Sequence, residues 1–326
     1  MANGKVVRLA GRERSQESSE RRPRLQVMNA GDLLSLEIPP RECVLEPVLR
    51  ECETAMLHAW RGVGKTHVAL GIAVAVATGS KFLRWNAPQP RKVLYLDGEM
   101  PAAAMQERLA AAIPQKFRKL ADSNLTLLCA DLQRRPIRSL ASPEGQRDVA
   151  PFVRDADLVI VDSISTLAAY GRENEAESAL PLQQWALRLR RRGKTLLLVH
   201  HDSKLGQQRG TSRREDILDL VIQLTHPPDY DRRDGARFIV RYSKARTAHG
   251  DAVTPFEARL KADDTGHDEW RTRDHGTAQL ARAAELFRNG CKVEDVRAEL
   301  GVSRSTAYRL REEARERGLL TRASTA

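Results

Sequence analysis

The chain has 326 residues, of which 41% are hydrophobic, and this length is sufficient for one large domain and a small one. Its formal net charge is +11, with 7 basic and 3 acidic residues in 1–25 and 12 basic and 8 acidic residues in 271–326, so both ends are basic around a nearly neutral middle. Four scattered cysteines without a CxxC pair argue against a disulfide framework and a zinc module, and no apolar run approaches the length of a membrane span, so we expect a soluble cytoplasmic protein without membrane contact.

Residues 1–28 are polar, charged and without hydrophobic periodicity, which predicts a disordered basic tail. Basic ends of this kind indicate contact with a polyanion such as nucleic acid, although a solvated basic surface would have the same composition. The charge therefore suggests a class of partner without deciding it.

Over residues 29–265 short apolar segments alternate with longer helical ones, and we expect one large domain here. The expected strands are TAMLHA, KVLYLDGE, LTLLCA, DLVIVDS, KTLLLVHH, LDLVIQL and ARFIVRY, and the expected helices are GKTHVALGIAVAVATG, PAAAMQERLAAAI and ESALPLQQWALRLRRRG. This alternation predicts an α/β fold with a mostly parallel sheet covered on both faces. The strands after Leu218 follow one another closely, which predicts an antiparallel extension of that sheet.

A polar stretch at 266–276 predicts a linker, and residues 277–326 predict a small all-α domain of three helices. Gly290 would end the first helix, Gly301 would turn the chain between the second and third, and Ser303 would cap the third. The side chains that the third helix would turn outward are Arg304, Ser305, Tyr308, Arg309 and Arg311.

This C-terminal pattern resembles the helix-turn-helix of resolvases and related DNA-binding proteins. The resemblance implies that the third helix enters the major groove of duplex DNA. It implies DNA contacts by Arg304, Ser305, Tyr308 and Arg309. Small three-helix domains can instead bind protein, which is the alternative.

The segment AWRGVGKTHVAL lies between an expected strand and an expected helix, the context that a phosphate-binding loop requires. Gly62 and Gly64 let backbone N–H groups turn toward the phosphates, Lys65 would neutralise phosphate charge, and the Thr66 hydroxyl would bind magnesium. Ala59 stands where the usual GxxxxGK[ST] pattern has its first glycine, but the position asks only for a small residue whose φ can stay negative. We therefore expect ATP and Mg²⁺ as cofactors, bound through Arg61, Gly62, Val63, Gly64, Lys65, Thr66 and His67.

Acidic residues follow two further expected strands. Asp162 ends the apolar part of DLVIVDS and would hold magnesium together with Thr66, whereas a helix N-cap is its ordinary alternative. Glu99 comes just after KVLYLD, where a carboxylate could orient and deprotonate an attacking water, and Asp97 is the competing candidate.

Several of these residues occur in the order found in RecA-like ATPases of the AAA family, and the chain resembles especially the plasmid RepA-type hexameric replicative helicases. The resemblance covers about residues 40–262 and is carried by Lys65, Thr66, Glu99, Asp162 and the pair His200–His201. It implies that Glu99 is the catalytic base and that His200 or His201 senses the γ-phosphate, with a surface histidine pair as the alternative.

The resemblance continues through RYSKARTAHGD, where related helicases carry a KxR pair on a late strand. It implies that Lys244 and Arg246 reach the ATP of a neighbouring subunit, so that the active site is composite and the protein forms a hexameric ring. Exposed basic residues on an edge strand are the alternative.

The segment HHDSKLGQQRGTSRREDILD follows the strand that would carry the sensor histidine. RecA-like motors place a DNA-binding loop at this point, and the resemblance implies that Lys204, Arg209 and Arg213 contact single-stranded DNA. A solvated loop is the alternative.

Together these patterns predict an ATP-hydrolysing, DNA-binding RecA-like ring ATPase, a helicase in the replication of plasmid or mobile DNA. The rival hypothesis is a DNA-bound ATPase switch, a regulator or recombination mediator that uses ATP to control assembly. A third is an ATP-dependent scaffold with a protein-binding tail.

Overall fold

The structure is a computed structural model that describes residues 25, 27–168, 180–202, 216–262 and 268–320. Its contacts divide the chain into the units Met1–Arg41 and Glu42–Ala326. In the described part of the first unit, α1 (Ala30–Leu34) begins after Asn29, whose side chain accepts a hydrogen bond from the Asp32 N–H. The functional residues discussed below belong to the second unit.

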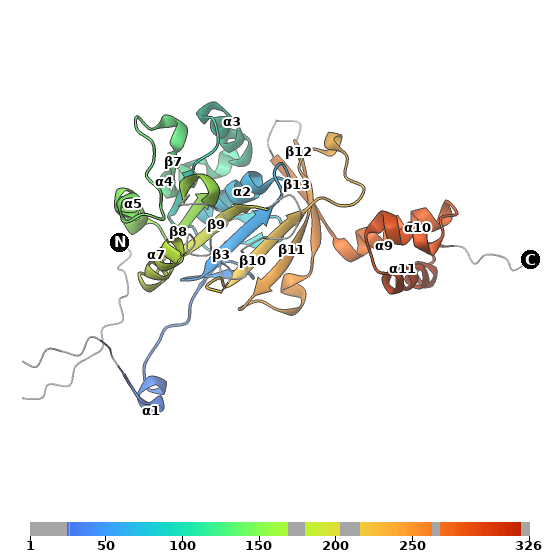
Figure 1. Cartoon of the computed structure of the whole chain (residues 1–326), viewed down its shortest axis with the longest axis horizontal. Coiled ribbons are helices and arrows are strands. Elements are labelled where there is room, and N and C mark those ends of the chain that lie inside the picture. The colour runs from blue at the N-terminus through green and yellow to red at the C-terminus, as the bar shows by residue number, and fades with distance from the viewer. Residues whose placement is uncertain (1–24, 26, 169–179, 203–215, 263–267, 321–326) are drawn as a thin grey trace, which may run out of the picture. The chain divides into compact units, whose positions relative to one another are not determined.

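A nine-stranded sheet forms the centre of the second unit (Figure 1). Six neighbouring strands are parallel, in the order β7 (Leu125–Cys129), β6 (Val93–Asp97), β8 (Leu158–Asp162), β9 (Thr195–His201), β3 (Thr54–Ala59) and β10 (Leu220–Thr225). The sheet continues through three antiparallel strands, β11 (Arg237–Ala245), β12 (Phe256–Ala262) and β13 (Asp268–Asp274). The predicted α/β class and its antiparallel extension are confirmed.

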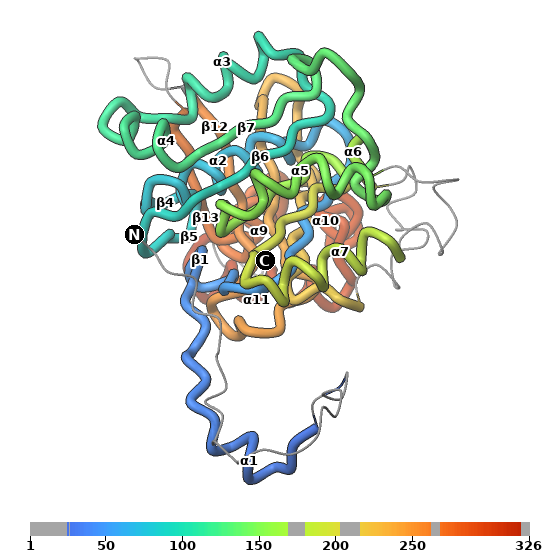
Figure 2. Tube along the Cα trace, turned by 90° about the vertical axis from the view of Figure 1, so that its left-hand side faces the viewer, coloured from blue at the N-terminus to red at the C-terminus, as the bar shows by residue number. Residues whose placement is uncertain are grey.

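Helices cover both faces of the parallel strands (Figures 1 and 2). One face carries α2 (Lys65–Thr78), α3 (Ala102–Ala112) and α4 (Arg118–Asn124), and the other carries α5 (Pro143–Asp155), α6 (Ile164–Leu167) and α7 (Leu180–Arg191). Alternate residues of β3 serve the two sides, because Ala55 and Leu57 pack with α2 whereas Met56 packs in the other cluster. Every residue of β3 is therefore buried, as the run TAMLHA predicts.

The remaining elements of this body are short. Two small antiparallel pairs are β1 (Cys43–Leu45) with β2 (Leu49–Arg50) and β4 (Lys81–Phe82) with β5 (Trp85–Asn86). The 3₁₀ turns are η1 (Gln115–Phe117), η2 (Ala130–Leu132), η4 (Arg232–Asp234) and η5 (Gly250–Val253). None of the helices in the described residues combines the length and the apolar character needed to cross a membrane.

The segment that we expected to be a linker contains strand β13 instead. Asp268–Asp274 pairs with β12 along its whole length, and its side chains alternate between half-buried and exposed. The charges that suggested a linker are those of an edge strand, where every second side chain meets water. Trp270 on the inner side packs against the rings of Phe82 and Phe238, and this single aromatic residue anchors the strand.

Three helices follow β13 directly, α9 (His275–Arg288), α10 (Val293–Leu300) and α11 (Arg304–Glu316). They share a small core of Leu280, Ala283, Ala284, Val296, Leu300, Leu310 and Ala314. Gly290 and Gly301 have φ values of 84° and 61°, and the Ser303 hydroxyl accepts a hydrogen bond from the Thr306 N–H. The predicted helix ends and cap are therefore present, although α9 starts two residues before the expected boundary.

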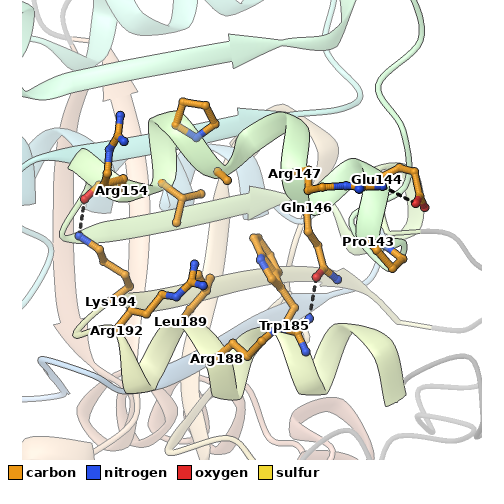
Figure 3. A pocket seen from close by; sticks show the side chains of 13 residues that line it. Pro143, Glu144, Gln146, Arg147, Arg154, Trp185, Arg188, Leu189, Arg192 and Lys194 are labelled. Atoms are coloured by element: carbon orange, nitrogen blue, oxygen red, sulfur yellow. Dashed lines mark hydrogen bonds and ion pairs between the residues drawn. The ribbon is translucent and has the colours of Figure 1, made fainter.

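A groove with a volume of 1170 Å³ runs between α5 and α7 (Figure 3). Trp185 and Leu189 form part of its buried apolar floor, and five cationic side chains line it against one carboxylate. The cations are Arg147, Arg154, Arg188, Arg192 and Lys194. The groove shares no residue with the phosphate-binding loop.

Gly71 in the middle of α2 is required by packing rather than by backbone geometry. A Cβ at this position would overlap the ring of Phe82. We expect Gly71→Ala to destabilise the protein by about 1–3 kcal/mol, because the buried Phe82 ring has to shift. This loss would exceed the gain that alanine gives through its higher helix propensity. Thermal or denaturant unfolding measures this.

Gly276→Ala is the matched control, because Gly276 also lies in a helix and nothing lies within 4 Å of the position that a methyl group would take there. It should be neutral or slightly stabilising. Equal stability of the two variants would contradict the packing at Phe82.

Candidate nucleotide site

The phosphate-binding loop connects β3 to α2 at the carboxyl edge of the parallel strands, where α/β sheets bind ligands. Gly62 and Gly64 have φ values of 81° and 121°, which favour glycine. A Cβ on Gly64 would lie 3.1 Å from the ring of Phe238, whereas nothing lies within 4 Å of one on Gly62. Both glycines are therefore required by their positive φ values. Gly64 is required in addition because Phe238 of β11 leaves little room for a side chain.

Ala59 replaces the usual first glycine without strain. Among the described residues other than glycine, only Cys52 and Leu83 have a positive φ, so Ala59 keeps an ordinary backbone conformation. Its methyl group is buried at the end of β3. The departure from the common pattern thus leaves the loop intact.

Lys65 is 5% exposed and folds back onto the loop. Its Nζ donates to the carbonyl oxygens of Ala59 at 2.9 Å and Trp60 at 3.0 Å. Burial lowers the pKa of Lys65 to about 8, against the opposing influence of Asp162, Asp202 and Glu99. A buried ammonium group held by two carbonyls can exchange them for phosphate oxygens.

Asp162 ends β8 and is 3% exposed. Its Oδ2 accepts a hydrogen bond from the Tyr95 hydroxyl at 2.6 Å, and the Thr66 side chain also hydrogen-bonds to this carboxylate. Burial raises the pKa of Asp162, while the bonds from Tyr95 and Thr66 oppose that rise. The two predicted magnesium ligands are therefore neighbours, and their oxygen donors suit Mg²⁺.

Glu99 lies just beyond β6 and is held by two donors. Its Oε1 accepts from the Ser163 hydroxyl at 2.5 Å, and His201 Nε2 lies 3.0 Å from Oε1 and 3.2 Å from Oε2. Burial acts to raise the pKa of Glu99, but the bonds from Ser163 and His201 outweigh it and lower the pKa overall. Glu99 is thus an oriented carboxylate that is ionised at neutral pH.

Asp97, the competing candidate, is fully buried and serves the turn that carries Glu99. Its Oδ1 accepts from the backbone N–H groups of Glu99 and Met100, both at 3.3 Å. Burial raises the pKa of Asp97 to about 6. These contacts favour Glu99 as the base and give Asp97 a positioning role.

The histidine pair at the end of β9 separates into two environments. His201 contacts Glu99, whereas His200 stands in register with His58 on the neighbouring strand β3. The contact favours His201 over His200 as the histidine of the site.

Four residues of this site were not identified from the sequence. Tyr95 and Ser163 hold Asp162 and Glu99, as described above. His58 is 3% exposed and its Nδ1 lies 2.8 Å from Asp202 Oδ1, while the Asp202 N–H donates to the Ala59 carbonyl at 3.0 Å. For His58 the sequence did carry a signal, because it is a polar residue within the mostly apolar run TAMLHA. A polar group buried in such a strand needs a hydrogen-bond partner.

Lys244 and Arg246 do not reach the phosphate loop of their own chain. In the register of β10 and β11, Leu220 faces both Ala245 and Ala55, so the end of β11 lies at the amino edge of the parallel strands. The Arg246 Nη2 donates to the Asp216 carbonyl at 3.0 Å, and its Nη1 lies 3.5 Å from Asp219 Oδ1. The pair is thus about one strand length away from Lys65.

The residues expected to contact DNA fall into two groups. Lys204, Arg209 and Arg213 lie outside the described residues. Arg304, Ser305, Tyr308 and Arg309 are all exposed on α11, and Tyr308 is 45% exposed. Arg304 also pairs with Glu294 at 3.0 Å.

Arg311, expected to point outward, is only half-exposed. Its guanidinium lies over the Phe287 ring at 5.6 Å. It therefore contributes to packing of the three helices.

Comparison with known proteins places this loop and sheet in a family. Residues 18–207 match the family model described as AAA domain. The chain belongs to this AAA domain family. The loop after β3, the acid at the end of β8 and the mostly parallel sheet agree with a RecA-like nucleotide-binding core.

Two solved structures illustrate the likeness at low identity. A KaiC-like protein from the archaeon Pyrococcus horikoshii OT3 is 16% identical with a TM-score of 0.49, over 69% of this chain and 93% of that one. The flagellar accessory protein FlaH from Methanocaldococcus jannaschii is 14% identical with a TM-score of 0.49, over 68% and 90%. No curated protein sequence matches the chain.

The lowered pKa of Lys65 predicts a pH limit for nucleotide binding. Lys65 must be charged to bind phosphate, and in the free protein it loses its proton as pH rises through about 8. Nucleotide affinity should be insensitive to this group below that pH and should fall by up to about tenfold per pH unit above it. Titration with a fluorescent ATP analogue between pH 7 and 9.5 measures the effect, and Lys65→Ala should abolish the pH-dependent part. An affinity that stays constant up to pH 9.5 would contradict the burial of this ammonium group.

Glu99→Gln should reduce ATP turnover by at least about 100-fold while nucleotide binding is retained, because the amide cannot accept a proton. Asp97→Asn is the matched control, since an asparagine can still accept the two backbone hydrogen bonds at the turn. We expect it to keep most of the turnover. A loss confined to the Asp97 variant would reverse the two assignments.

Proposed function

We propose that the protein hydrolyses ATP, binds DNA and acts as a ring-forming helicase in the replication of plasmid or mobile DNA. The observation that carries the catalytic part is the convergence of Lys65, Asp162 and Glu99 at one edge of the sheet, with Glu99 oriented by Ser163 and His201. Such a group of charges supports phosphoryl transfer to water.

In this proposal the ionised Glu99 accepts a proton from the attacking water, and its two donors fix the direction in which that water lies. Lys65 leaves the carbonyls of Ala59 and Trp60 to hold the phosphates. Thr66 and Asp162 would hold Mg²⁺, which when bound neutralises phosphate charge. His201 would sense the γ-phosphate through Glu99, because the imidazole ring of His201 contacts the Glu99 carboxylate directly.

Lys244 and Arg246 could act in catalysis only in a composite site. Both lie at the edge of the sheet opposite to their own phosphate loop, so a role in catalysis requires the loop of a second copy. A guanidinium from a neighbour would stabilise the charge that develops on the phosphoryl group. The proposal therefore includes a homo-oligomer, a hexameric ring.

DNA would meet the protein in two places. The exposed side of α11, with Arg304, Ser305, Tyr308 and Arg309, would enter the major groove of a duplex. Lys204, Arg209 and Arg213 remain proposed contacts for single-stranded DNA, on the resemblance alone.

A second candidate function is a DNA-bound ATPase switch. The observation that favours it is the direct passage from β13 into α9, because the helices follow the sheet without a linker and Arg84 fixes Asp274 at the junction at 2.5 Å. A duplex reader that is continuous with the ATPase sheet suits a regulator better than a translocating motor. Footprinting on duplex DNA also separates both from a protein-binding scaffold, which would protect no site.

Steady-state ATP hydrolysis with and without single-stranded DNA distinguishes motor from switch, with Lys65→Ala as the blank. For a motor we expect at least about tenfold stimulation by single-stranded DNA, because strand contact and phosphate state are coupled. Hydrolysis that depends on Lys65 and ignores single strands would favour the duplex-bound switch. An absence of hydrolysis above the blank under all conditions would contradict the enzymatic proposal.

Arg246→Ala should abolish turnover and spare nucleotide binding if the residue acts on a neighbouring subunit. Mixed with an excess of Lys65→Ala subunits, which keep Arg246, the variant should regain part of its turnover, because its intact sites then receive an arginine from the neighbour.

Arg190→Ala is the matched control for this experiment, since Arg190 also lies beside Asp219, at 3.7 Å, on α7. It removes a cation from the same carboxylate and should leave turnover near wild type. Normal turnover of the Arg246 variant would refute the composite site.

A further inference from the structure

A second hollow, with a volume of 530 Å³, lies where the antiparallel strands meet the three helices. It is lined by Arg241 on β11 and by His275 at the start of α9. Two hydroxyl residues also line it, Ser303, which caps α11, and Thr306 in its first turn. Its size falls in the range of ligand pockets, which is about 300–1,000 Å³. None of its lining residues belongs to the nucleotide site.

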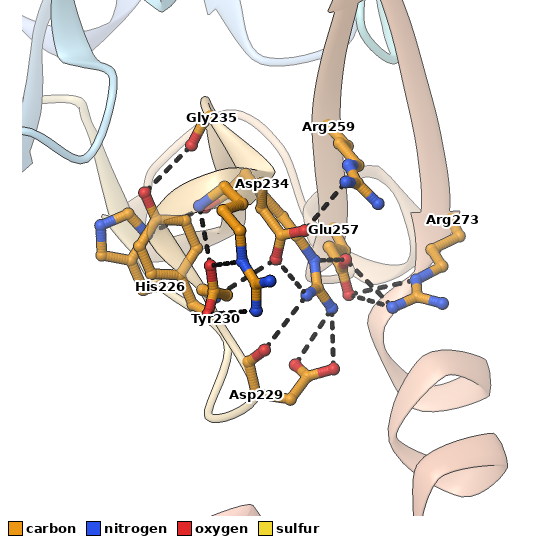
Figure 4. A network of polar contacts seen from close by, with 11 residues as sticks. His226, Asp229, Tyr230, Asp234, Gly235, Glu257, Arg259 and Arg273 are labelled. Carbon is orange, nitrogen blue, oxygen red and sulfur yellow. Dashed lines mark hydrogen bonds and ion pairs between the residues drawn. The ribbon is translucent and has the colours of Figure 1, made fainter.

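The carboxylates on the sheet side of this cavity are occupied by other arginines (Figure 4). Arg237 donates to Glu257 at 2.7 Å, to Asp234 at 2.9 Å and to Asp229 at 3.0 Å. Two further arginines complete the group, Arg273 on Glu257 at 2.9 Å and Arg259 on Asp234 at 2.8 Å. Three arginines thus meet three carboxylates, and the network is balanced in charge.

On the helix side the cavity is bordered by one further ion pair. Glu299 accepts from Arg282 at 3.1 Å, and Arg282 also holds Glu285 at 2.9 Å. This carboxylate too is already engaged by a guanidinium.

Arg241 stands apart from these pairs. It is half-buried, and in the described part of the chain its side chain has a hydrogen bond to His275 Nε2 at 3.0 Å and none to a carboxylate. A guanidinium can only donate, so the ring nitrogen accepts and His275 is neutral in this contact. Burial lowers the pKa of Arg241, and burial followed by the charge of Arg241 lowers the pKa of His275. Among the described residues no carboxylate is hydrogen-bonded to this half-buried guanidinium, so its remaining N–H groups can take an anion.

We propose that this cavity binds a phosphate group, with the guanidinium of Arg241 as its principal ligand. The planar fork of arginine matches two oxygens of a phosphate. The hydroxyls of Ser303 and Thr306 also line the cavity and hydrogen-bond to each other at 2.8 Å, so one of them would have to redirect its proton to donate to the phosphate. The phosphate belongs either to a soluble compound or to a DNA backbone lying along α11. Only the second source rests on the function proposed above.

The first arm of the test uses free phosphate on the full chain carrying Lys65→Ala, which removes phosphate binding at the nucleotide loop. Inorganic phosphate or pyrophosphate, compared with chloride at equal ionic strength, should raise the thermal unfolding midpoint by about 2 °C or more. Adding Arg241→Gln should abolish the shift, and Arg241→Lys should reduce it because the fork is lost. Arg271→Gln is the control, since Arg271 is a 64% exposed residue of β13 that pairs with Glu269 outside the cavity.

The second arm measures the affinity for duplex DNA by fluorescence anisotropy across a range of salt concentrations. If the phosphate belongs to the backbone, Arg241→Gln should weaken binding at least about fivefold and lower the salt slope by about one, whereas Arg271→Gln should not. Free phosphate should then cause little shift in the first arm.

The arms also separate this proposal from the function proposed above. A phosphate shift that depends on Arg241, without any duplex binding, would support a site for a soluble phosphate compound and would refute only the DNA-binding part of the proposed function. If neither readout distinguishes Arg241→Gln and Arg241→Lys from Arg271→Gln, the phosphate site does not exist.

Discussion

The carbonyl oxygen of Ala59 is the point on which the candidate site depends. It accepts hydrogen bonds from the Lys65 ammonium at 2.9 Å and from the Asp202 N–H at 3.0 Å. One acceptor therefore ties the first residue of the phosphate loop, the lysine at its end and the residue that follows β9. The buried ammonium is satisfied by carbonyls of its own loop, and the pairing of β3 with β9 adds the Asp202 N–H to the same acceptor.

The same edge gathers several carboxylates whose environments differ. Burial raises the pKa of both Asp97 and Asp162, whereas hydrogen bonds from Ser163 and His201 lower the pKa of Glu99. Neighbouring carboxyl groups with different pKa values are typical of sites in which one group accepts a proton while others bind a cation or position the first group. In the proposed function Glu99 accepts the proton, while Asp162 holds charge and Asp97 holds the turn.

At the antiparallel end of the sheet, charged side chains form a second network. Three arginines and three carboxylates neutralise one another around Glu257, and the aromatic side chain of Trp270 fixes the edge strand that leads into α9. The three helices follow this strand directly, and Arg241 of β11 hydrogen-bonds to His275 at the start of α9 at 3.0 Å.

Short windows of the sequence predicted the local features: the strand TAMLHA, the glycines at positive φ, Lys65 at the start of α2, the acid that ends β8 and the caps of the C-terminal helices. Each depends on neighbours in the chain, either through periodicity or through backbone conformation, and so it is visible in a short window. Only the tertiary structure decided the rest. The choice of Glu99 over Asp97, the partnership of His58 with Asp202 and the strand in place of a linker depend on contacts between residues far apart in the sequence. Burial and distance between such residues are set by the order of the strands, which no local pattern of side chains specifies.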